Sequence, residues 1–262
     1  MSFEFDIHDK WLKKLDQQTR ELLQKSGSDR KTLSEVFDRH TLLNIGKLIS
    51  DQIIEYVDFP ISTGKEANVF RAVTPNQEFV ALKIYRTSTL TFKHIIHYIE
   101  GDPRFRFTTK NRRGIILEWA KKEFKNLERM HQEKIRVPVP IKRLENILVM
   151  EYIGSSQQPA PMLKDYKLKF PQRIFNSLTL SMKRLYQHAG LVHADLSPYN
   201  ILLYKEKPVI IDVGQAVVLE HPSAEDFLKR DIHNIVSYFR KYKITASEEQ
   251  ILKKIHKQKG KV

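Results

Sequence analysis

The alternation of apolar and polar positions predicts a chain that starts with helices, continues with strands and then returns to helices. Apolar residues recur at helical spacing from Asp9 to Lys25, and the capping-box sequence that opens at Thr32 predicts the start of a second helix. Further along, the pattern predicts the strands 53–61, 69–73 and 79–85, the helix 117–132, the strand 147–154, and the helices 171–189 and 224–240. A run of strands followed by a run of helices is typical of an α+β protein.

Two short apolar runs late in the chain, Ile201–Tyr204 and Val209–Ile211, predict a hairpin. Asp195 and Asn200 precede the first run and Asp212 follows the second, so the three polar side chains can face one small volume. Phosphoryl transfer needs this set, because it uses a base for the attacking hydroxyl and oxygen ligands for magnesium at the nucleotide phosphates. The spacing matches the pattern His-x-Asp-x-x-x-x-Asn followed by Asp-x-Gly. A polar loop that merely joins a helix to a hairpin would explain the first half of this pattern, and the downstream Asp-x-Gly argues against it.

The first three predicted strands form a candidate roof for a nucleotide. A tight turn between two strands, followed by Ala-x-Lys on the third, is how kinases cover ATP: the turn amides approach the phosphates and the lysine, here Lys83, reaches them. The turn is not a Walker A loop, and Gly64 is all that remains of the three usual kinase glycines. A lysine at a strand edge is more often just exposed, so Lys83 is informative only together with the other motifs. The turn residues expected at the nucleotide are Ser62, Thr63, Gly64, Lys65, Glu66 and Ala67.

Lys83 needs a carboxylate partner to hold it in place. Glu123 lies beside the apolar stripe of the helix 117–132 and is favoured, and Glu118 on the same helix is the competing candidate. Between Lys83 and this helix, the polar and basic stretch 86–113 is longer than a simple connection.

A buried strand from Ile147 onward takes the place of a kinase hinge. Backbone groups of Glu151 and Ile153, next to Met150, would there contact the edge of the adenine ring. A plain core strand would explain the same residues, and only their place in the order of the motifs favours the hinge.

Composition narrows the class of protein further. The 262 residues are 41% hydrophobic and contain no cysteine, which excludes disulfides and thiolate metal sites and fits a cytoplasmic protein. No apolar run approaches the ~18 residues of a membrane span, and the first residues do not form a signal peptide. The positive net charge of +14 comes from the residues after residue 60. Two segments there, 103–113 and 251–262, each contain five lysines or arginines and no acidic residue. A solvated surface would explain either segment alone, and together they favour a polyanionic partner, with RNA as the first candidate.

The roof, lysine, helix glutamate, hinge, catalytic loop and metal aspartate occur in the order of a protein kinase, from about residue 58 to residue 216. The sequences at 62–67, 193–197 and 211–216 resemble those of the RIO family of atypical serine kinases, and of its first subfamily in an archaeal-type short form. Ala194 replaces the arginine that reads a phosphorylated activation loop, and Val213 replaces the phenylalanine of Asp-Phe-Gly. No Ala-Pro-Glu follows, so how a protein substrate would dock is left open.

The resemblance implies a bilobal, protein-kinase-like fold. Its expected parts are an N-terminal helical extension at 1–52, a small β-rich N-lobe at 53–150, and a reduced helical C-lobe with a basic tail at 151–262. It also implies binding of ATP and Mg²⁺ (or Mn²⁺), autophosphorylation on serine, ATPase activity, and a role with the precursor of the small ribosomal subunit or its RNA.

The same resemblance assigns roles to the candidate residues. Asp195 is expected to be the catalytic base, Asn200 and Asp212 the metal ligands, and Lys83 with Glu123 the pair that positions the phosphates. Asp212 could also attack phosphorus and form an acyl phosphate.

Two alternatives remain open at the level of sequence. One is a small-molecule phosphotransferase of the aminoglycoside-kinase type, which shares the catalytic-loop pattern but is expected to carry an acidic large lobe. The other is an RNA-binding assembly factor that uses ATP only as a switch.

Overall fold

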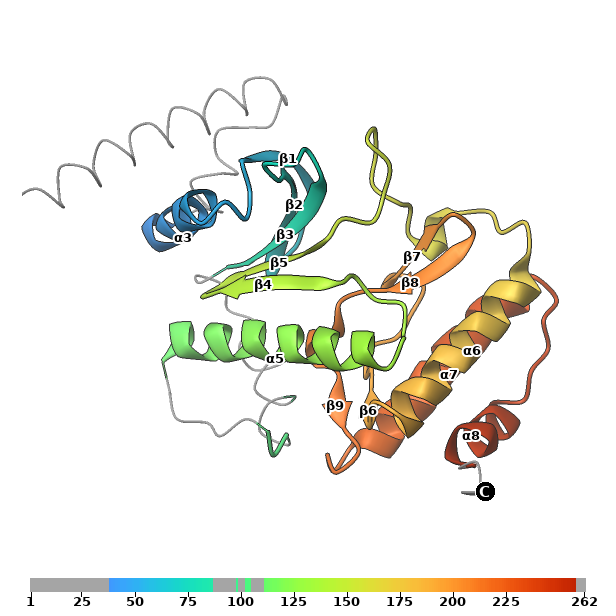
Figure 1. Cartoon of the computed structure of the whole chain (residues 1–262). Helices are drawn as coiled ribbons and strands as arrows, with labels where there is room; N and C mark the ends of the chain where they lie inside the picture. The colour runs from blue at the N-terminus through green and yellow to red at the C-terminus, as the bar shows by residue number, and fades with distance from the viewer. Residues whose placement is uncertain (1–37, 87–97, 99–101, 105–110, 258–262) are drawn as a thin grey trace, which may run out of the picture. The chain divides into compact units, whose positions relative to one another are not determined.

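The computed structural model describes residues 38–86, 98, 102–104 and 111–257, and the helix predicted at 9–25 and the helix start predicted at Thr32 lie outside them (Figure 1). The described residues form two compact units. The first contains residues 38–86, 112–120 and 141–152, and the second contains residues 98, 102–104, 111, 121–140 and 153–257. These bounds differ from a division at residue 150, because the segment from Lys121 to Pro140 belongs to the second unit.

The first unit is built on a five-stranded sheet with the strand order β1-β2-β3-β5-β4. The pairs β1–β2, β2–β3 and β3–β5 are antiparallel. The strands lie within a few residues of their predicted positions, and β4 was not predicted. Their bounds are β1 (Tyr56–Thr63), β2 (Ala67–Val73), β3 (Phe79–Tyr85), β4 (Pro140–Leu144) and β5 (Ile147–Glu151).

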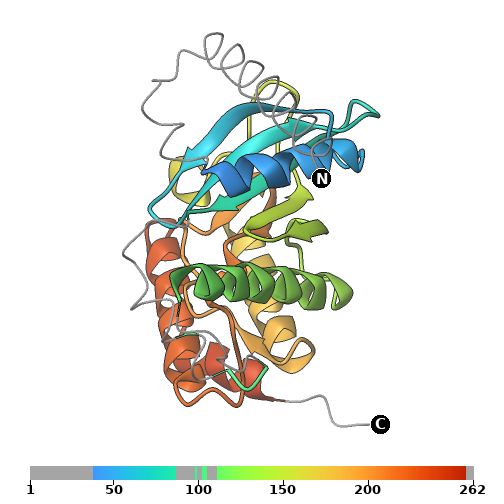
Figure 2. The same ribbon diagram turned by 90° about the vertical axis from the view of Figure 1, so that its left-hand side faces the viewer.

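Helix α3 (Arg39–Ser50) packs on this sheet, as Figure 2 shows for the blue helix. It starts after Asp38, whose carboxylate accepts a hydrogen bond of 2.7 Å from the backbone N–H of Thr41. Its buried residues Ile45 and Leu48 join one hydrophobic core with apolar side chains of β2, β3 and β5. The apolar side chains of the helix and those of the strands thus pack together in the core of the first unit.

The charged side chain of Arg71 packs within the first unit, between aromatic rings. The guanidinium of Arg71, on β2, lies 4.3 Å from the ring centre of Phe59 and 4.2 Å from that of Phe79. Its Nε donates a hydrogen bond of 2.6 Å to the carboxylate of Asp58. Arg71 is therefore a buried structural residue rather than part of a basic surface.

Helix α5 (Arg112–Gln132) starts five residues before its predicted start, and its residues are shared between the two units. The segment 112–120 belongs to the first unit and the segment 121–132 to the second.

The second unit is mainly helical. In Figure 1, α6 and α7 lie side by side, and α8 packs on both of them. The observed bounds of α6 end two residues before its predicted end, and those of α7 agree with the prediction. The elements are α6 (Pro171–Gln187), β6 (Leu191–Val192), β7 (Ile201–Tyr204), β8 (Lys207–Ile210), β9 (Val217–Val218), α7 (Ala224–Arg240) and α8 (Glu248–His256).

Helix α8 contains the first part of the basic segment 251–262, up to His256. The hydroxyl oxygen of Ser247 caps the helix by accepting a hydrogen bond of 3.2 Å from the backbone N–H of Gln250. Ile251 and Ile255 lie four residues apart, on one face of the helix, and both are buried. The lysines between these two isoleucines give the segment its basic character, and the two isoleucines form the apolar face with which the helix packs. No helix among the described residues is long and apolar enough to cross a membrane.

Candidate active site

The loop that carries Asp195 is held by α7 on both of its sides. The carboxylate of Asp231 accepts hydrogen bonds from the backbone N–H groups of Ala194, at 2.9 Å, and Leu196, at 2.8 Å. Arg230 donates to the carbonyl oxygen of Ala194, and Asn234 donates to that of Leu196 at 3.1 Å. The backbone N–H and carbonyl groups of both residues that flank Asp195 are therefore fixed by α7.

Asp231 is a residue that the sequence reasoning missed. It is only 1% exposed, and burial raises the pKa of its carboxyl to about 7, against the effect of the two backbone donors. An acidic residue inside the apolar stripe of α7, between Leu228 and Ile235, was the available signal.

Asp195 and Asn200 are brought together as the sequence predicted. The side-chain amide of Asn200 donates 2.9 Å to the carboxylate of Asp195 and 2.8 Å to its backbone carbonyl oxygen. Because Nδ2 is used in this way, the Oδ1 atom of Asn200 is the end that can bind a cation. Burial raises the pKa of Asp195, and the nearby negative charge of Asp212 raises it further.

Asp212 lies next to this pair because the hairpin β7–β8 closes the loop. Ile201 pairs with Ile210, and the backbone N–H of Ile211 donates 3.0 Å to the carbonyl oxygen of Asn200. Asp212 is exposed and adopts the left-handed conformation, with φ 57° and ψ 58°. This conformation costs a non-glycine residue about 1 kcal/mol, so the surroundings must hold it.

His193 contacts the backbone directly before Asp212. It is 1% exposed, and its Nε2 donates to the carbonyl oxygen of Ile211 at 3.1 Å. Burial lowers its pKa to about 4, so the ring is neutral near pH 7. His193 therefore has a supporting role and does not supply a charge.

The donor set fits a magnesium ion that is shared with a nucleotide. The carboxylate of Asp212 and the Oδ1 of Asn200 are hard oxygen ligands, and Mg²⁺ is usually held by one or two such groups together with water and phosphates. Among the described residues, no group of three or more His, Cys, Asp or Glu side chains is arranged to hold a metal by itself.

The candidate residues of the first unit are also defined. A Cβ atom at Gly64 would lie 2.9 Å from the carbonyl oxygen of Ala67, so the turn between β1 and β2 requires glycine. Lys83 is 9% exposed on β3, and its Nζ lies 5.4 Å from the ring centre of Tyr85. Ser62, Thr63, Lys65 and Glu66 lie in or beside this turn.

The two candidate partners of Lys83 differ in burial, because Glu123 is 1% exposed and Glu118 is half-buried. Glu118 and Lys83 belong to the first unit and Glu123 to the second.

The structure describes the backbone hydrogen bonds of the predicted hinge residues. Met150 and Glu151 end β5, where they pair with Ala81 and Val80 of β3. The carbonyl oxygen of Ile153 accepts a hydrogen bond of 2.9 Å from the backbone N–H of Ala160, so one of its lone pairs is used within the second unit.

The basic segment 103–113 is not uniformly a solvated surface. Arg104 donates to both carboxylate oxygens of Asp102, at 2.9 and 2.6 Å, and to the side-chain oxygen of Asn126 at 3.0 Å. Arg113 lies 3.8 Å from Glu145, in an exposed pair. Arg104 therefore has an internal role, and Arg106 lies outside the described residues.

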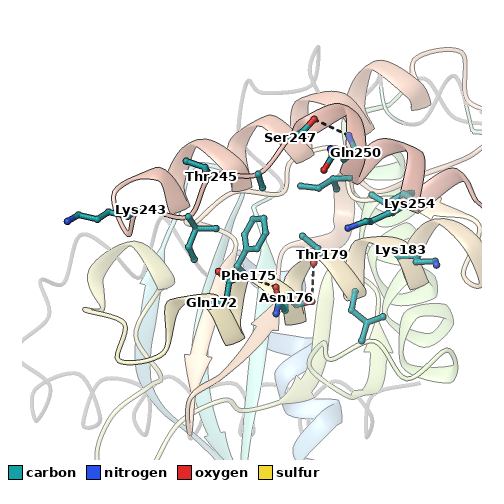
Figure 3. Close-up of a pocket in the computed structure, with 15 residues that line it drawn as sticks. Gln172, Phe175, Asn176, Thr179, Lys183, Lys243, Thr245, Ser247, Gln250 and Lys254 are labelled. Atoms are coloured by element: carbon teal, nitrogen blue, oxygen red, sulfur yellow. Dashed lines mark hydrogen bonds between the residues drawn. The ribbon is translucent and has the colours of Figure 1, made fainter.

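A separate pocket of about 630 Å³ lies between α6, α8 and the connection before α8 (Figure 3). Phe175 and Thr179 line it from α6, and Lys254 reaches it from α8. The catalytic-loop residues are not among those that line it, so this pocket is not the candidate active site.

Comparison with known proteins shows which family the chain resembles. A sequence model described as the RIO domain matches residues 68–252. The RIO-type serine/threonine-protein kinase Rio1 of Haloferax volcanii is 41% identical, over 87% of this chain and 78% of its own length. The Rio1 protein of Methanocaldococcus jannaschii is 39% identical, over 96% of this chain and 85% of its own length. The human serine/threonine-protein kinase RIO1 is 39% identical, and the matched region is 40% of its length.

Solved structures show the fold. A crystal structure of the Rio2 kinase from Chaetomium thermophilum has a TM-score of 0.67 at 22% identity, and covers 84% of this chain and 68% of that chain. A structure of the same kinase, described as an ADP/Mg²⁺-phosphoaspartate complex, has a TM-score of 0.63 at 23% identity, and covers 83% of this chain and 66% of that chain. The chain has a protein-kinase-like α+β fold.

Proposed function

The chain belongs to the RIO domain family, and from this premise we propose that it transfers the γ-phosphoryl group of ATP to a serine or threonine hydroxyl. The observation that carries the proposal is the Asn200 side chain, whose amide holds the carboxylate of Asp195 at 2.9 Å while its oxygen remains for a cation. The residue proposed as the base and a residue proposed as a metal ligand are thus hydrogen-bonded to each other, next to Asp212. The matched relatives are named as protein kinases, which favours a protein acceptor over a small molecule.

Each residue has a distinct task in this reaction. Asp195 accepts the proton of the attacking hydroxyl as the new bond from oxygen to the γ-phosphorus forms. The bond between that phosphorus and the β–γ bridging oxygen breaks, and ADP leaves with the electron pair. Asn200 and Asp212 would hold Mg²⁺, which neutralises charge on the phosphates. We expect Lys83 to bind the phosphates and Glu123, the more buried of the two candidates, to position Lys83.

Replacement of Asp195 with asparagine tests the central assignment. Asp195→Asn should slow phosphoryl transfer roughly 10²–10⁴-fold, because the base is lost, with little change in ATP affinity. Asp165→Asn, at an exposed carboxylate of the same unit, is the matched control and should have wild-type rates. If Asp195→Asn instead loses ATP affinity while the rate of phosphoryl transfer from bound ATP is unchanged, Asp195 is not the catalytic base. In the wild type, the rate should fall on acidification at a higher pH than for an ordinary aspartate, because burial raises the pKa of Asp195.

A second chemical route uses Asp212 as the acceptor. The exposed carboxylate of Asp212 could attack the γ-phosphorus and release ADP, and water would then hydrolyse the acyl phosphate in an ATPase cycle. The Rio2 structure described as a phosphoaspartate complex motivates this route. A phosphoenzyme at Asp212 should be cleaved by hydroxylamine, whereas phosphoserine resists it. Enzyme-bound label that fully survives hydroxylamine under single-turnover conditions would exclude the route.

A ribosomal precursor RNA is the partner that we propose from charge. The net charge of +14 supports a polyanion, and Lys253 and Lys254 on α8 supply part of it. Binding should weaken as salt rises, with a slope of about 0.7 per phosphate contact for single strands. Binding that is indifferent to salt would reject an RNA surface.

A further inference from the structure

Helix α5 sends a buried lysine to the loop that follows Asp212. The side chain of Lys122 is 0% exposed, and its Nζ donates 2.7 Å to the carbonyl oxygen of Gly214 and 2.5 Å to that of Ala216. All of these residues belong to the second unit. The contact joins residues 92 and 94 positions apart in the sequence, so it depends on the tertiary structure alone.

Asn126, one helical turn after Lys122, makes a second pair of bonds to the same loop. Its Nδ2 donates 2.8 Å to the carbonyl oxygen of Val213 and 3.1 Å to that of Ala216. Its Oδ1 accepts 3.0 Å from Arg104, which fixes the orientation of the amide with its donor side toward the loop. Lys122 and Asn126 together are called the α5 clamp below.

A hydrophobic residue would be a less costly occupant of the Lys122 position. Lysine is almost never fully buried without a specific partner, since removal of the ammonium from water is expensive. Burial lowers the pKa of Lys122 to about 7, although Asp102 and Glu123 act in the opposite direction. A position that carries this penalty is a candidate for a functional role.

The loop that follows Asp212 depends on hydrogen bonds from outside the loop. Asp212 has a positive φ of 57°, and the turn Val213–Gln215 follows it directly. Val213 and Ala216 are 0% exposed, so water cannot replace the donors that the clamp supplies to their carbonyl groups. The clamp thus holds the backbone immediately after Asp212, the residue with the positive φ.

We propose that Lys122 and Asn126 are positioning residues for Asp212, and that they set the affinity of the site for Mg²⁺ with a nucleotide through backbone carbonyl groups of residues 213–216. The inference rests on the proposed function, in which Asp212 is a metal ligand. Arg104 acts one layer further out, because it orients Asn126 and is itself held by both oxygens of Asp102.

The test separates the metal from the nucleotide. ADP affinity is measured by calorimetry with Mg²⁺ and in EDTA, for the wild type, Lys122→Met and the control Lys125→Met, which changes an exposed lysine of the same helix. Lys122→Met should lose about 10–100-fold of the affinity that Mg²⁺ adds, as loss of an outer ligand support typically does, with metal-free ADP affinity unchanged. Amide hydrogen exchange at residues 213–216 should also become faster in Lys122→Met without ligand. Lys125→Met should match the wild type.

Arg104→Met keeps the test informative if Lys122→Met does not fold, because the Arg104 side chain is 21% exposed and lies at the edge of the network. It should lower the same Mg²⁺-dependent affinity by a smaller factor. A folded Lys122→Met protein that keeps the full contribution of Mg²⁺ overturns this inference alone, as does an equal loss with and without metal. A wild-type protein whose ADP affinity ignores Mg²⁺ overturns the proposed function together with the inference.

Discussion

Replacement of Asp231 with alanine should destabilise the folded protein by about 2–6 kcal/mol. The carboxylate accepts the buried N–H groups of Ala194 and Leu196, and each buried donor left without a partner costs about 1–3 kcal/mol. The loss is a large part of the roughly 5–15 kcal/mol that stabilises an ordinary domain. Asp231→Asn should fall between the wild type and Asp231→Ala, because its single side-chain oxygen can accept from one of the two N–H groups.

The pH dependence follows from the raised pKa. Burial raises the pKa of Asp231 to about 7, so from about pH 4 to pH 7 the folded protein binds a proton there that the unfolded chain has released. The stability of the wild type should therefore fall as pH rises through this window, by at most about 1.4 kcal/mol per pH unit. Asp231→Asn cannot titrate at this position. The advantage of the wild type over Asp231→Asn should thus shrink from pH 5 to pH 7 and stay constant above it.

Urea unfolding, followed by circular dichroism at several pH values, measures both effects. Asp226→Ala, at an exposed carboxylate in the first turn of the same helix, is the control and should lose only a few tenths of a kcal/mol. Equal m-values in all variants would show that the transitions can be compared. A loss below about 1 kcal/mol in Asp231→Ala would refute the hydrogen-bond argument. A wild-type advantage that grows with pH would show that the two N–H donors outweigh burial in setting the pKa.

Three further predictions concern residues elsewhere in the chain. Arg71→Lys should destabilise the protein by about 1–3 kcal/mol in urea unfolding, because an ammonium cannot stack on the rings of Phe59 and Phe79 or bond Asp58 as the planar guanidinium does. An unchanged unfolding midpoint would contradict this prediction. If Lys83 and Glu123 form the predicted pair, each alanine variant should lose most of the phosphoryl transfer and the double variant little more, whereas independent, additive losses would reject the pair. Gly190→Ala should lower the free energy of unfolding by about 1 kcal/mol, since Gly190 has a φ of 58° that alanine adopts with strain; a thermal melt like that of the wild type would argue against it.

Local signals in the sequence determined the order of the elements and the place of the catalytic loop. Asp195 and Asn200 meet because they lie five positions apart in one loop, and the hairpin that brings Asp212 beside them is closed by a short turn. Apolar periodicity fixed the ends of α7 and nearly those of α6, since one face of each helix is buried along its length. These features depend on residues that are close together in the sequence, so the sequence alone can predict them.

Only the tertiary structure decided which charged and polar side chains are buried. Lys122 has lysine neighbours on α5, and nothing in the sequence distinguishes it from the exposed Lys125. Its burial follows from a loop that starts about ninety residues later, and that of Asp231 from a loop 35 to 37 residues earlier. The cost of burying a charge depends on the groups that surround it in space. Therefore the sequence alone predicts candidate residues for the reaction, whereas the buried residues that hold their loops became visible only when distant segments were packed together.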